Sequence, residues 1–539
     1  MKRQLADGEQ RIGSDEKLSK IEVMENRSSE PTVSDLVDGG VHLVKVACLG
    51  AEANDRAIDG TVPRALSLFE LIRAIRPAAS IHFNYCIDPQ WVLRQYAPRR
   101  LRQCPITFVV GSRHLDALRA AVPPPLAANV RCVGVPLPFA YGTHHAKLSL
   151  FESEDGRALH VVVGTANLVP EDWGAKTQAF YHARGKFAMA AKKAKGDAVA
   201  VTANPIVNSG GTTSTALTSA VAAETAFVEQ QSVTASTSTE GRQQQRFRDD
   251  LVAYLRAAYP PSAGEVHRTI QFWVERIEQA DFSHIKDRIV ASVPGRFQRS
   301  ATDGDASCRF GHLRLRRLLS EAFSAEERQR HKTFVGQFSS VGSLGARPEA
   351  WLCDEFLTSL SGGRSMISAS SLKLIYPSVE NVRRSLEGYA AGLSLPYSSQ
   401  THQKQTYLKQ FLHQWRIIVF VLIFPRPFMS AASPHVKSYV ALDAAGECQW
   451  LLLTSANLSH SAWGKLEKGG TQLFIRSFEL GVLMCAKDNH RRQSPGGALF
   501  PPFDIPLTKY SADDEPFLVD MLYPTKTDAN GFRGAMDAQ

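Results

Sequence analysis

The sequence predicts an α/β protein in which two duplicated, pseudo-symmetric α/β sandwich domains share one active site. Three observations support this prediction. The chain of 539 residues is too long for a single hydrophobic core. Apolar runs with the period of strands alternate with segments that have the period of helices. A set of polar residues occurs twice, 290 residues apart and with the same internal spacing, which indicates a duplicated unit.

The first predicted elements follow a polar N-terminal segment. Residues 1–40 are charged and have no hydrophobic period, so we expect a disordered tail there. The run VHLVKVACL at 41–49 is typical of a buried strand. A helix over 65–75 and strands over 81–86 and 105–110 should follow, and this alternation favours an α/β sandwich.

Residues 184–243 interrupt this pattern with a run rich in Ala, Ser, Thr, Gly and Gln, which predicts a disordered surface loop. It falls within the first predicted domain, residues 41–293. An amphipathic helix resumes the fold over 249–259. The second domain is expected over 294–539. Its early helix, GHLRLRRLL, should bury its leucines and leave three arginines in solvent: Arg314, Arg316 and Arg317.

Charge and cysteine content limit the class of protein. The net charge of +9 and the pI near 9.1 suit an anionic partner such as nucleic acid, but they could equally serve solubility. The eight cysteines form no Cys-x-x-Cys pair, so neither a zinc signature nor a disulfide framework is present. With no signal peptide, we expect an intracellular protein with reduced thiols. The longest apolar run, 417–424, is far shorter than the roughly 20 residues that span a bilayer.

The repeated set contains a His-x-Lys pair, an Asn and a Trp in each copy: His145, Lys147, Asn167 and Trp173, then His435, Lys437, Asn457 and Trp463. Lys to Asn is 20 residues in both copies, and Asn to Trp is 6. A Thr-Gln pair also follows each copy: Thr177-Gln178 and Thr471-Gln472. We expect the tryptophans to pack in the core, and the six His, Lys and Asn residues to meet at one site.

These residue types suit phosphoryl chemistry. Alternation with apolar neighbours predicts that each His and Lys share one face of a strand, and each Asn ends an apolar strand. Imidazole can act as nucleophile, acid or base near neutral pH, while ammonium and amide groups can hold phosphoryl oxygens. Two histidines on opposite sides of one phosphorus could divide an in-line displacement into two steps through a phosphohistidine. We expect no metal or other cofactor, because the lysines supply the positive charge.

A His-x-Lys pair followed by Asn, present twice, resembles the phospholipase D superfamily. That family usually has an Asp five residues after the Lys, where this chain has Glu152 and Leu442. The departure is similar to the tyrosyl-DNA phosphodiesterase branch, which lacks the Asp. Longer similarities run from about residue 41 to 525, apart from the insertion, and include FNYC (83–86), GTHHAK (142–147), PGRFQ (294–298), GQFSSVGSLG (336–345), SPHVKSY (433–439) and residues 454–483.

The resemblance implies phospholipase D-like α-β-α domains and a DNA-repair phosphodiesterase. Such an enzyme would hydrolyse the 3′-phosphotyrosyl bond between DNA and a topoisomerase I-derived peptide, and could remove other 3′ blocking groups. His145 would be the nucleophile. His435 would protonate the departing tyrosine and then activate water, leaving a 3′-phosphate. The remaining members of the two sets would hold the phosphoryl oxygens: Lys147, Lys437, Asn167 and Asn457.

Further roles are implied around this centre. Glu479 would orient His145 with a carboxylate, and Gln178 would orient His435 without adding charge. On the DNA side, the implied residues are Tyr141 for base stacking and Ser340 and Ser343 for backbone phosphates. On the peptide side they are Pro396 and Lys404. From the residues alone, Tyr141 could instead be core and the Gly/Ser loop only a turn, while Phe83 and Tyr85 are expected in the core.

Several alternatives remain open at this point. Residues 416–432 are unusually apolar and lie just before His435, so they are either a buried strand or in part translated non-coding sequence. A real segment there could misplace His435 and impair the enzyme. The chain could be another nuclease or lipid phosphodiesterase of the superfamily, or an impaired DNA-binding relic. We expect a nuclear monomer that acts on single- or double-stranded DNA 3′ ends in the manner of an exonuclease, without membrane association. The nuclear location follows from the implied task, since Lys192, Lys193 and Lys195 could be simply solvated.

Overall fold

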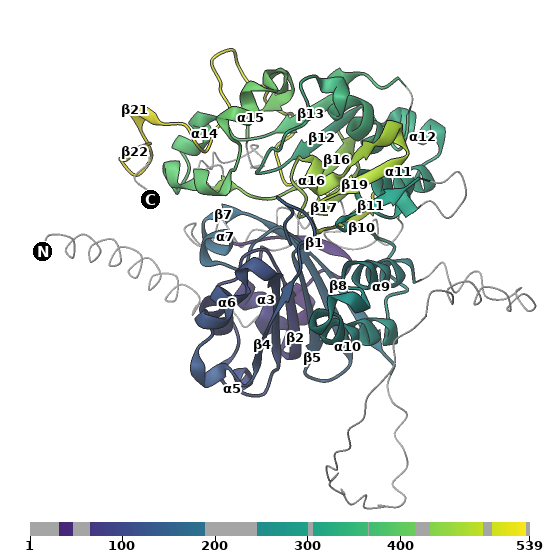
Figure 1. The fold of residues 1–539 in the computed structure, drawn as a ribbon, viewed down its shortest axis with the longest axis vertical. Helices are drawn as coiled ribbons and strands as arrows, with labels where there is room; N and C mark the ends of the chain where they lie inside the picture. The colour runs from purple at the N-terminus through teal and green to yellow at the C-terminus, as the bar shows by residue number, and fades with distance from the viewer. Residues whose placement is uncertain are drawn as a thin grey trace, which may run out of the picture.

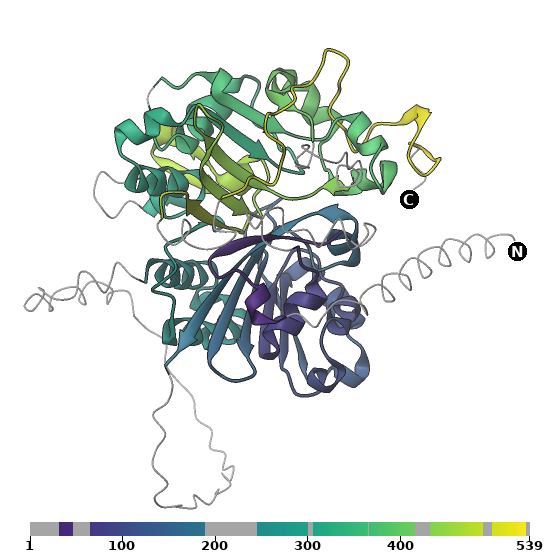
Figure 2. The ribbon, with the colours of Figure 1, turned by 180° about the vertical axis from the view of Figure 1, so that it is seen from behind.

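The computed structural model describes residues 32–46, 65–188, 245–299, 306–364, 366–415, 432–488 and 499–534. Most of the predicted tail, most of the low-complexity insertion and nearly all of the apolar segment 416–432 lie outside these ranges. The described residues form two domains, one stacked on the other (Figure 1; Figure 2 from behind). No helix among them combines the length and the apolar character needed to cross a membrane.

The first domain is built on an eight-stranded sheet in the order β1-β8-β6-β5-β2-β3-β4, with β9 paired to β8. Its strands are β1 (Gly40–Leu43), β2 (Pro77–Phe83), β3 (Ile106–Gly111), β4 (Val130–Val135), β5 (Leu148–Ser153), β6 (Ala158–Gly164), β8 (Ala179–Phe187) and β9 (Ala280–Asp281). Helices cover one face: α3 (Leu68–Ile75), α4 (Pro89–Arg94), α5 (Pro98–Leu101), α6 (Leu115–Ala121) and α7 (Pro170–Gly174). Helices α9 (Arg246–Ala258) and α10 (Glu265–Gln279) cover the other.

The second domain is built on a seven-stranded sheet in the order β10-β20-β17-β16-β12-β13-β14. Its strands are β10 (Arg288–Ser292), β12 (Thr333–Gln337), β13 (Leu372–Ile375), β14 (Leu412–His413), β16 (Ser438–Leu442), β17 (Cys448–Thr454) and β20 (Glu479–Cys485). Its helical elements are α11 (Gly311–Ala322), α12 (Ala325–Arg330), a π-helical stretch (Leu352–Leu357), α13 (Thr358–Leu360), α14 (Val379–Arg383), α15 (Ser399–Gln403) and α16 (His460–Trp463). Smaller ladders join β11 (Gly295–Gln298), β19 (Gln472–Ile475) and β18 (Lys465–Glu467), and join β21 (Tyr523–Thr527) with β22 (Arg533–Gly534).

The two sheets have the same topology. In each, the first four strands of the order pair antiparallel, the fourth strand pairs antiparallel with the fifth, and the last three are parallel. Strands β5 and β6 of the first sheet therefore correspond to β16 and β17 of the second. This correspondence confirms the predicted α/β fold of two pseudo-symmetric halves.

One hydrophobic core joins the two domains. It contains residues of the first sheet such as Leu148 and Val161, residues of α9 and α10, and residues of the second sheet such as Val440 and Val482. A separate core lies between the second sheet and α11, the π-helical stretch and their neighbours. Burial of the shared core should stabilise the stacked arrangement, since burial of apolar area contributes roughly 25 cal/mol per Å².

Several element boundaries differ from the predictions. The predicted 65–75 helix begins at Leu68, because Ser67 caps it: the Ser67 hydroxyl accepts the Glu70 amide and the Glu70 carboxylate accepts the Ser67 amide. Strand β8 continues to Phe187, four residues into the predicted insertion, because those residues pair with β6 and β9. Strand β10 pairs with β20 in the second sheet, so that sheet begins before residue 294.

Two expectations about exposure also need correction. Residues 32–40 were expected in a disordered tail, but Leu36 is buried and Asp38 pairs with His284. The leucines of α11 are buried as predicted. Arg314 of the same helix is not simply solvated, because it pairs with Asp250 at 2.7 Å and is mostly buried.

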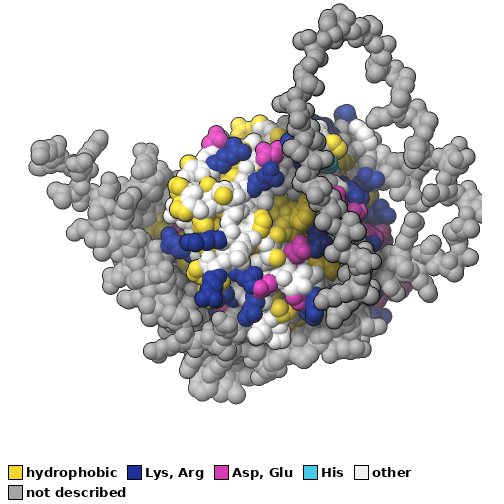
Figure 3. Space-filling view, turned by 90° about the horizontal axis from the view of Figure 1, so that it is seen from below, with side chains coloured by type: hydrophobic (Ala, Val, Ile, Leu, Met, Phe, Trp, Pro, Cys, Tyr) yellow, Lys and Arg dark blue, Asp and Glu magenta, His cyan; other side chains and the backbone are white. Residues whose placement is uncertain are grey.

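The end of the first domain that is farthest from the second carries α5 (Figure 1). A surface hollow there is lined by Pro98, Arg99, Arg100, Arg102 and Gln103. Seen from below, Lys and Arg side chains alternate with acidic and apolar ones over this face (Figure 3). Arg100 pairs with Glu154, so part of this charge is neutralised locally.

Candidate active site

The two His-x-Lys pairs lie immediately before equivalent strands. His145 and Lys147 precede β5, which begins at Leu148, and His435 and Lys437 precede β16, which begins at Ser438. The sequence prediction placed them within strands, which is wrong by one to three residues. Ala146, which lies between His145 and Lys147, is fully buried in the hydrophobic core.

Backbone hydrogen bonds anchor each His to the opposite domain. The His145 amide donates to the Phe478 carbonyl at 3.0 Å, and the His435 amide donates to the Thr177 carbonyl at 3.2 Å. The second contact belongs to a short parallel ladder between β7 (Lys176–Thr177) and β15 (Ser433–Pro434). Because Phe478 and Thr177 directly precede Glu479 and Gln178, each His lies beside a polar side chain of the other domain.

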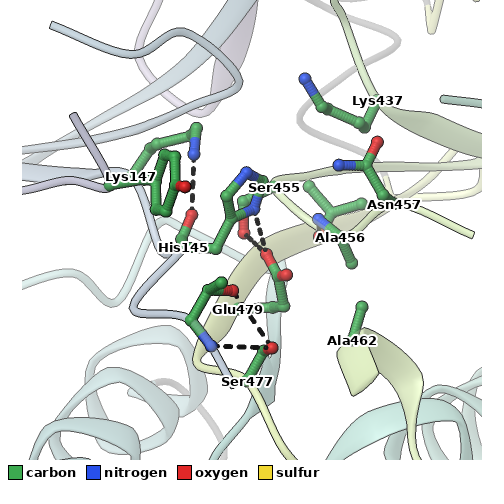
Figure 4. A network of polar contacts seen from close by, with 12 residues as sticks. His145, Lys147, Lys437, Ser455, Ala456, Asn457, Ala462, Ser477 and Glu479 are labelled. Carbon is green, nitrogen blue, oxygen red and sulfur yellow. Dashed lines mark hydrogen bonds and ion pairs between the residues drawn. The ribbon is translucent and has the colours of Figure 1, made fainter. Parts of the chain in front are cut away.

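His145 is held by a carboxylate. Its Nδ1 lies 2.9 Å from Glu479 Oε2, and the same oxygen accepts the Ser455 hydroxyl at 2.5 Å (Figure 4). Burial would raise the pKa of Glu479, but His145, Lys147 and the Ser455 hydroxyl together hold that pKa below its usual value. An ionised Glu479 fixes the proton on Nδ1 and leaves Nε2 with a free lone pair, as a nucleophile requires.

His435 is held by an amide and a carboxylate. Its Nδ1 lies 2.6 Å from Gln178 Nε2 and 3.2 Å from Asp172 Oδ2. The expectation that His435 is oriented without charge is therefore incomplete. Burial lowers the pKa of His435, and Asp172 acts in the opposite direction. The Gln178 amide nitrogen can only donate, so it bonds to Nδ1 of the ring when that nitrogen carries no proton. When the ring is protonated, the Asp172 carboxylate is the acceptor for the Nδ1 proton.

Gln178 and Glu479 occupy equivalent positions in the two halves. The Thr165 hydroxyl donates to Gln178 Oε1 at 2.6 Å, just as the Ser455 hydroxyl donates to Glu479. The Thr-Gln pair at 471–472 is thus not the counterpart of 177–178, because Gln472 begins β19 in a separate small sheet. The repeated Thr-Gln pair was a coincidence of sequence.

The carboxylates come from different positions of the repeat. Asp172 lies five residues after Asn167, and the matching position after Asn457 is Ala462 (Figure 4). The first domain therefore supplies Gln178 and Asp172 to His435, and the second supplies Glu479 to His145. Each His receives one carboxylate, although the repeat places the two carboxylates at different positions.

The two asparagines follow the strands that the apolar runs predicted. Asn167 comes three residues after β6 ends, and Asn457 three residues after β17 ends. Asn457 Oδ1 accepts the backbone amides of Ser339 and Ser340, both at 3.1 Å, so its amide NH₂ is left for the site. Asn167 Oδ1 is buried and has no hydrogen-bond partner in the described part of the chain.

The two lysines lie on either side of the His145 ring (Figure 4). Each ammonium donates to the carbonyl of the His two residues earlier. Burial lowers the pKa of Lys147 to about 8, and burial together with the charge of Lys147 lowers the pKa of Lys437 well below its usual value. Two buried cations that repel each other would be stabilised by an anion placed between them. A phosphoryl group is such an anion.

The residues predicted to bind substrate differ in their exposure and in their hydrogen-bond partners. Tyr141 is 88% exposed with φ at 60°, which excludes the core alternative. Ser343 is exposed, whereas the Ser340 hydroxyl already donates to the Pro396 carbonyl at 2.9 Å. Lys404 is exposed at the end of α15.

The predictions for the aromatic residues are confirmed for three of them and wrong for Tyr85. Phe83 is buried in the core as expected. Tyr85 is only half-buried, and its ring centre lies 5.5 Å from that of His145, so it is a wall of the site rather than a core residue. Trp173 and Trp463 are buried, with their indole N–H groups bonded to Asn167 and Tyr439, which confirms their packing role. No group of three or more His, Cys, Asp or Glu side chains arranged to hold a metal occurs among the described residues.

Comparison with known proteins agrees with this arrangement. A model of the tyrosyl-DNA phosphodiesterase family matches residues 53–511. A probable tyrosyl-DNA phosphodiesterase of Caenorhabditis elegans is 36% identical over 464 residues, with 84% of each chain covered. Tyrosyl-DNA phosphodiesterase 1 of Drosophila melanogaster is 29% identical over 463 residues, covering 82% of this chain and 68% of that protein. The crystal structure of the yeast tyrosyl-DNA phosphodiesterase shares the fold, with a TM-score of 0.58 at 17% identity over 89% of this chain and 99% of that chain.

Two domains of one topology, each giving a His, a Lys and an Asn to a common site, have the phospholipase D-like fold that the resemblance implied. Within that class, the chain belongs to the tyrosyl-DNA phosphodiesterase family. It is therefore a phosphodiesterase of DNA repair.

Proposed function

We propose that this chain hydrolyses the 3′-phosphotyrosyl bond that joins DNA to a topoisomerase I-derived peptide, through a covalent phosphohistidine. The observation that carries the proposal is the crossed support of the two histidines. His145 of the first domain is oriented by Glu479 of the second, and His435 of the second by Gln178 of the first. Crossed support suits a phosphorus atom bound between the domains and attacked from one side while its leaving group departs from the other.

In the first step, His145 Nε2 attacks the phosphorus and forms a P–N bond. The bond from phosphorus to the tyrosyl oxygen breaks, and His435 gives its Nε2 proton to that oxygen. Burial lowers the pKa of His145, with Glu479 opposing, so the imidazole is largely neutral and ready to attack near pH 7. The negative charge of the bound phosphodiester raises the pKa of His435 and favours its protonated form.

In the second step, His435 is neutral and accepts a proton from water, and the water oxygen attacks the phosphorus. The P–N bond breaks, His145 is restored, and the DNA leaves with a 3′-phosphate. Through both steps Lys147 and Lys437, with the amides of Asn167 and Asn457, hold the non-bridging oxygens where negative charge develops.

The DNA would lie over Tyr141, whose exposed ring can stack a base for roughly 1–3 kcal/mol without sequence preference. Ser343 would contact a phosphate of the same strand. Ser340 would join it by turning its hydroxyl away from the Pro396 carbonyl, since its backbone amide is bonded to Asn457. The peptide would leave past Pro396 and Lys404. Other 3′ blocking groups, a monomeric state and a nuclear location belong to the same proposal.

The test is cleavage of a 3′-phosphotyrosyl oligonucleotide by the full chain, with EDTA present. We expect an oligonucleotide that ends in a 3′-phosphate, and none from the His145→Ala variant. A folded chain that leaves this substrate intact but cleaves a plain diester or a lipid would instead be another superfamily phosphodiesterase. Salt-sensitive DNA binding without any turnover would identify a catalytically impaired relic.

A further inference from the structure

A row of alternating charges runs from His435 into the interface between the domains. His435 Nδ1 lies 3.2 Å from Asp172 Oδ2, and the other Asp172 oxygen lies 3.7 Å from Lys176 Nζ. Lys176 Nζ in turn lies 3.2 Å from Glu387 Oε1. Asp172 and Lys176 belong to the first domain and Glu387 to the second, so the row crosses the domain boundary beside β7, which lies where the first domain faces the second (Figure 1).

The row is buried. The side chains of Asp172 and Lys176 are each 4% exposed, and that of Glu387 is 18% exposed. Glu387 Oε2 is buried without a hydrogen-bond partner in the described part of the chain. A buried ion pair gains little stability over apolar residues of the same volume, because removing both charges from water is costly. Stability alone therefore does not account for this buried row of charges.

The other half-site has no such row. Among the described residues, Glu479 is within 4.0 Å of His145 alone as an ion pair, and it accepts a further hydrogen bond from the neutral Ser455 hydroxyl, while the charge of Lys147 acts on it from farther away. The difference matches the different duties of the two histidines. His145 only has to be a neutral nucleophile, whereas His435 has to donate a proton in one step and accept one in the next.

We propose that Lys176 and Glu387 are positioning residues that act through Asp172 and set the acid–base behaviour of His435. The inference relies on the proposed function only for the duty assigned to His435. Lys176 holds Asp172 in place and shields part of its negative charge from the imidazole. Glu387 offsets the positive charge of Lys176. The pair therefore keeps the pKa of His435 between the value that suits proton donation in the first step and the value that suits proton acceptance in the second.

The signs follow from the charges that face His435. These are Asp172, which raises its pKa, and Lys437 and Lys176, which lower it. Removal of the Lys176 charge in Lys176→Met should therefore raise the pKa of His435. Removal of the Glu387 charge in Glu387→Gln leaves Lys176 less compensated and should lower it. A purely structural role would not move the pKa in opposite directions.

The experiment measures single-turnover formation of the covalent intermediate on a 3′-phosphotyrosyl oligonucleotide as a function of pH. Because this step needs protonated His435, its rate falls as pH rises through the pKa of His435 in the complex. We expect the alkaline midpoint to move up in Lys176→Met and down in Glu387→Gln, each by roughly half a pH unit or more. Lys176→Arg should restore the wild-type profile.

The matched control is Arg276→Met on α10, which removes a part-buried ion pair with Glu152 of β5. It should keep the wild-type profile. Profiles that do not move, or that move the same way in Lys176→Met and Glu387→Gln, would overturn the proposal. If the wild-type chain does not cleave the substrate, the proposed function fails, and the row is then tested by NMR titration of isotope-labelled His435 without substrate. An unchanged midpoint in Lys176→Met would refute it there.

Discussion

Asp172 is the residue whose contribution at the site was hardest to foresee. The repeat identified six site residues because both copies have the same types at the same spacing. Asp172 has no counterpart in the second copy, where Ala462 stands, and a search for repeated residues cannot find an unrepeated one. The repeated Thr-Gln pair gave the opposite error, since it suggested a correspondence that the strands do not follow.

The two histidines should respond differently to substitution. His145→Ala removes the nucleophile, so neither turnover nor a covalent species is expected. His435→Ala removes the acid and base, and should slow turnover by about 10²–10⁴-fold. Steady-state and single-turnover rates on the 3′-phosphotyrosyl oligonucleotide measure both effects. Full activity of His435→Ala would show that the second half-site is assigned wrongly.

The lowered pKa of Lys147 predicts how phosphate binding depends on pH. Burial puts that pKa at about 8, so the ammonium is charged below this pH and loses its proton above it. The affinity for an oligonucleotide with a 3′-phosphate should therefore fall as pH rises through about 8, measured by fluorescence anisotropy. Lys147→Arg keeps that charge at all these pH values and should remove the part of the fall that Lys147 causes, leaving the part that Lys437 causes. A flat wild-type profile up to pH 10 would contradict the account.

At the scale of elements, the sequence predicted which segments are strands and helices better than where they end. The predicted 65–75 helix begins three residues later, at Leu68, because Ser67 caps it. Strand β8 extends four residues into the predicted insertion, because it pairs there with β6 and β9. Cap geometry and ladder partners are properties of the folded chain. The His-x-Lys pairs also lie just before their strands, because the two His amides bond to the opposite domain instead.

The capping box of α3 gives a stability prediction that is separate from catalysis. Ser67→Ala removes the acceptor for the Glu70 amide at 3.2 Å and should lower the free energy of unfolding by about 1 kcal/mol. Urea denaturation measures this loss. Ser67→Thr keeps the acceptor and serves as the control. Activity at 25 °C should be unchanged in both, and a loss of activity in Ser67→Ala without a loss of stability would contradict the assignment.

The loop that carries Tyr141 gives a binding prediction. Tyr141→Ala should weaken binding of a single-stranded oligonucleotide by roughly 1–3 kcal/mol, because one stacked base is lost. Tyr141→Phe keeps the ring and should bind almost as the wild type does. Equilibrium binding at fixed salt, with several base sequences, measures the effect. Equal affinities for Tyr141→Ala and the wild type would exclude Tyr141 from the DNA path.

At the scale of the molecule, the duplication predicted two domains and a shared site, and the matching topology of the sheets agrees. The shared core and the crossed support of the histidines could not be read from the chain, because they depend on how the two domains stack. The net charge of +9 did not locate the site either. Some of the arginines lie on α5 at the far end of the first domain.

The central claim is that His145 attacks the phosphorus while His435 serves the opposite side. It is tested most directly by quenching the reaction of a 5′-labelled 3′-phosphotyrosyl oligonucleotide with SDS at alkaline pH, which preserves the acid-labile P–N bond, followed by peptide mapping of the trapped protein. We expect DNA linked through phosphorus to His145, accumulating in His435→Ala and absent from His145→Ala. DNA linked to His435 instead, or cleavage by the wild type with no linked species at any time, would contradict it.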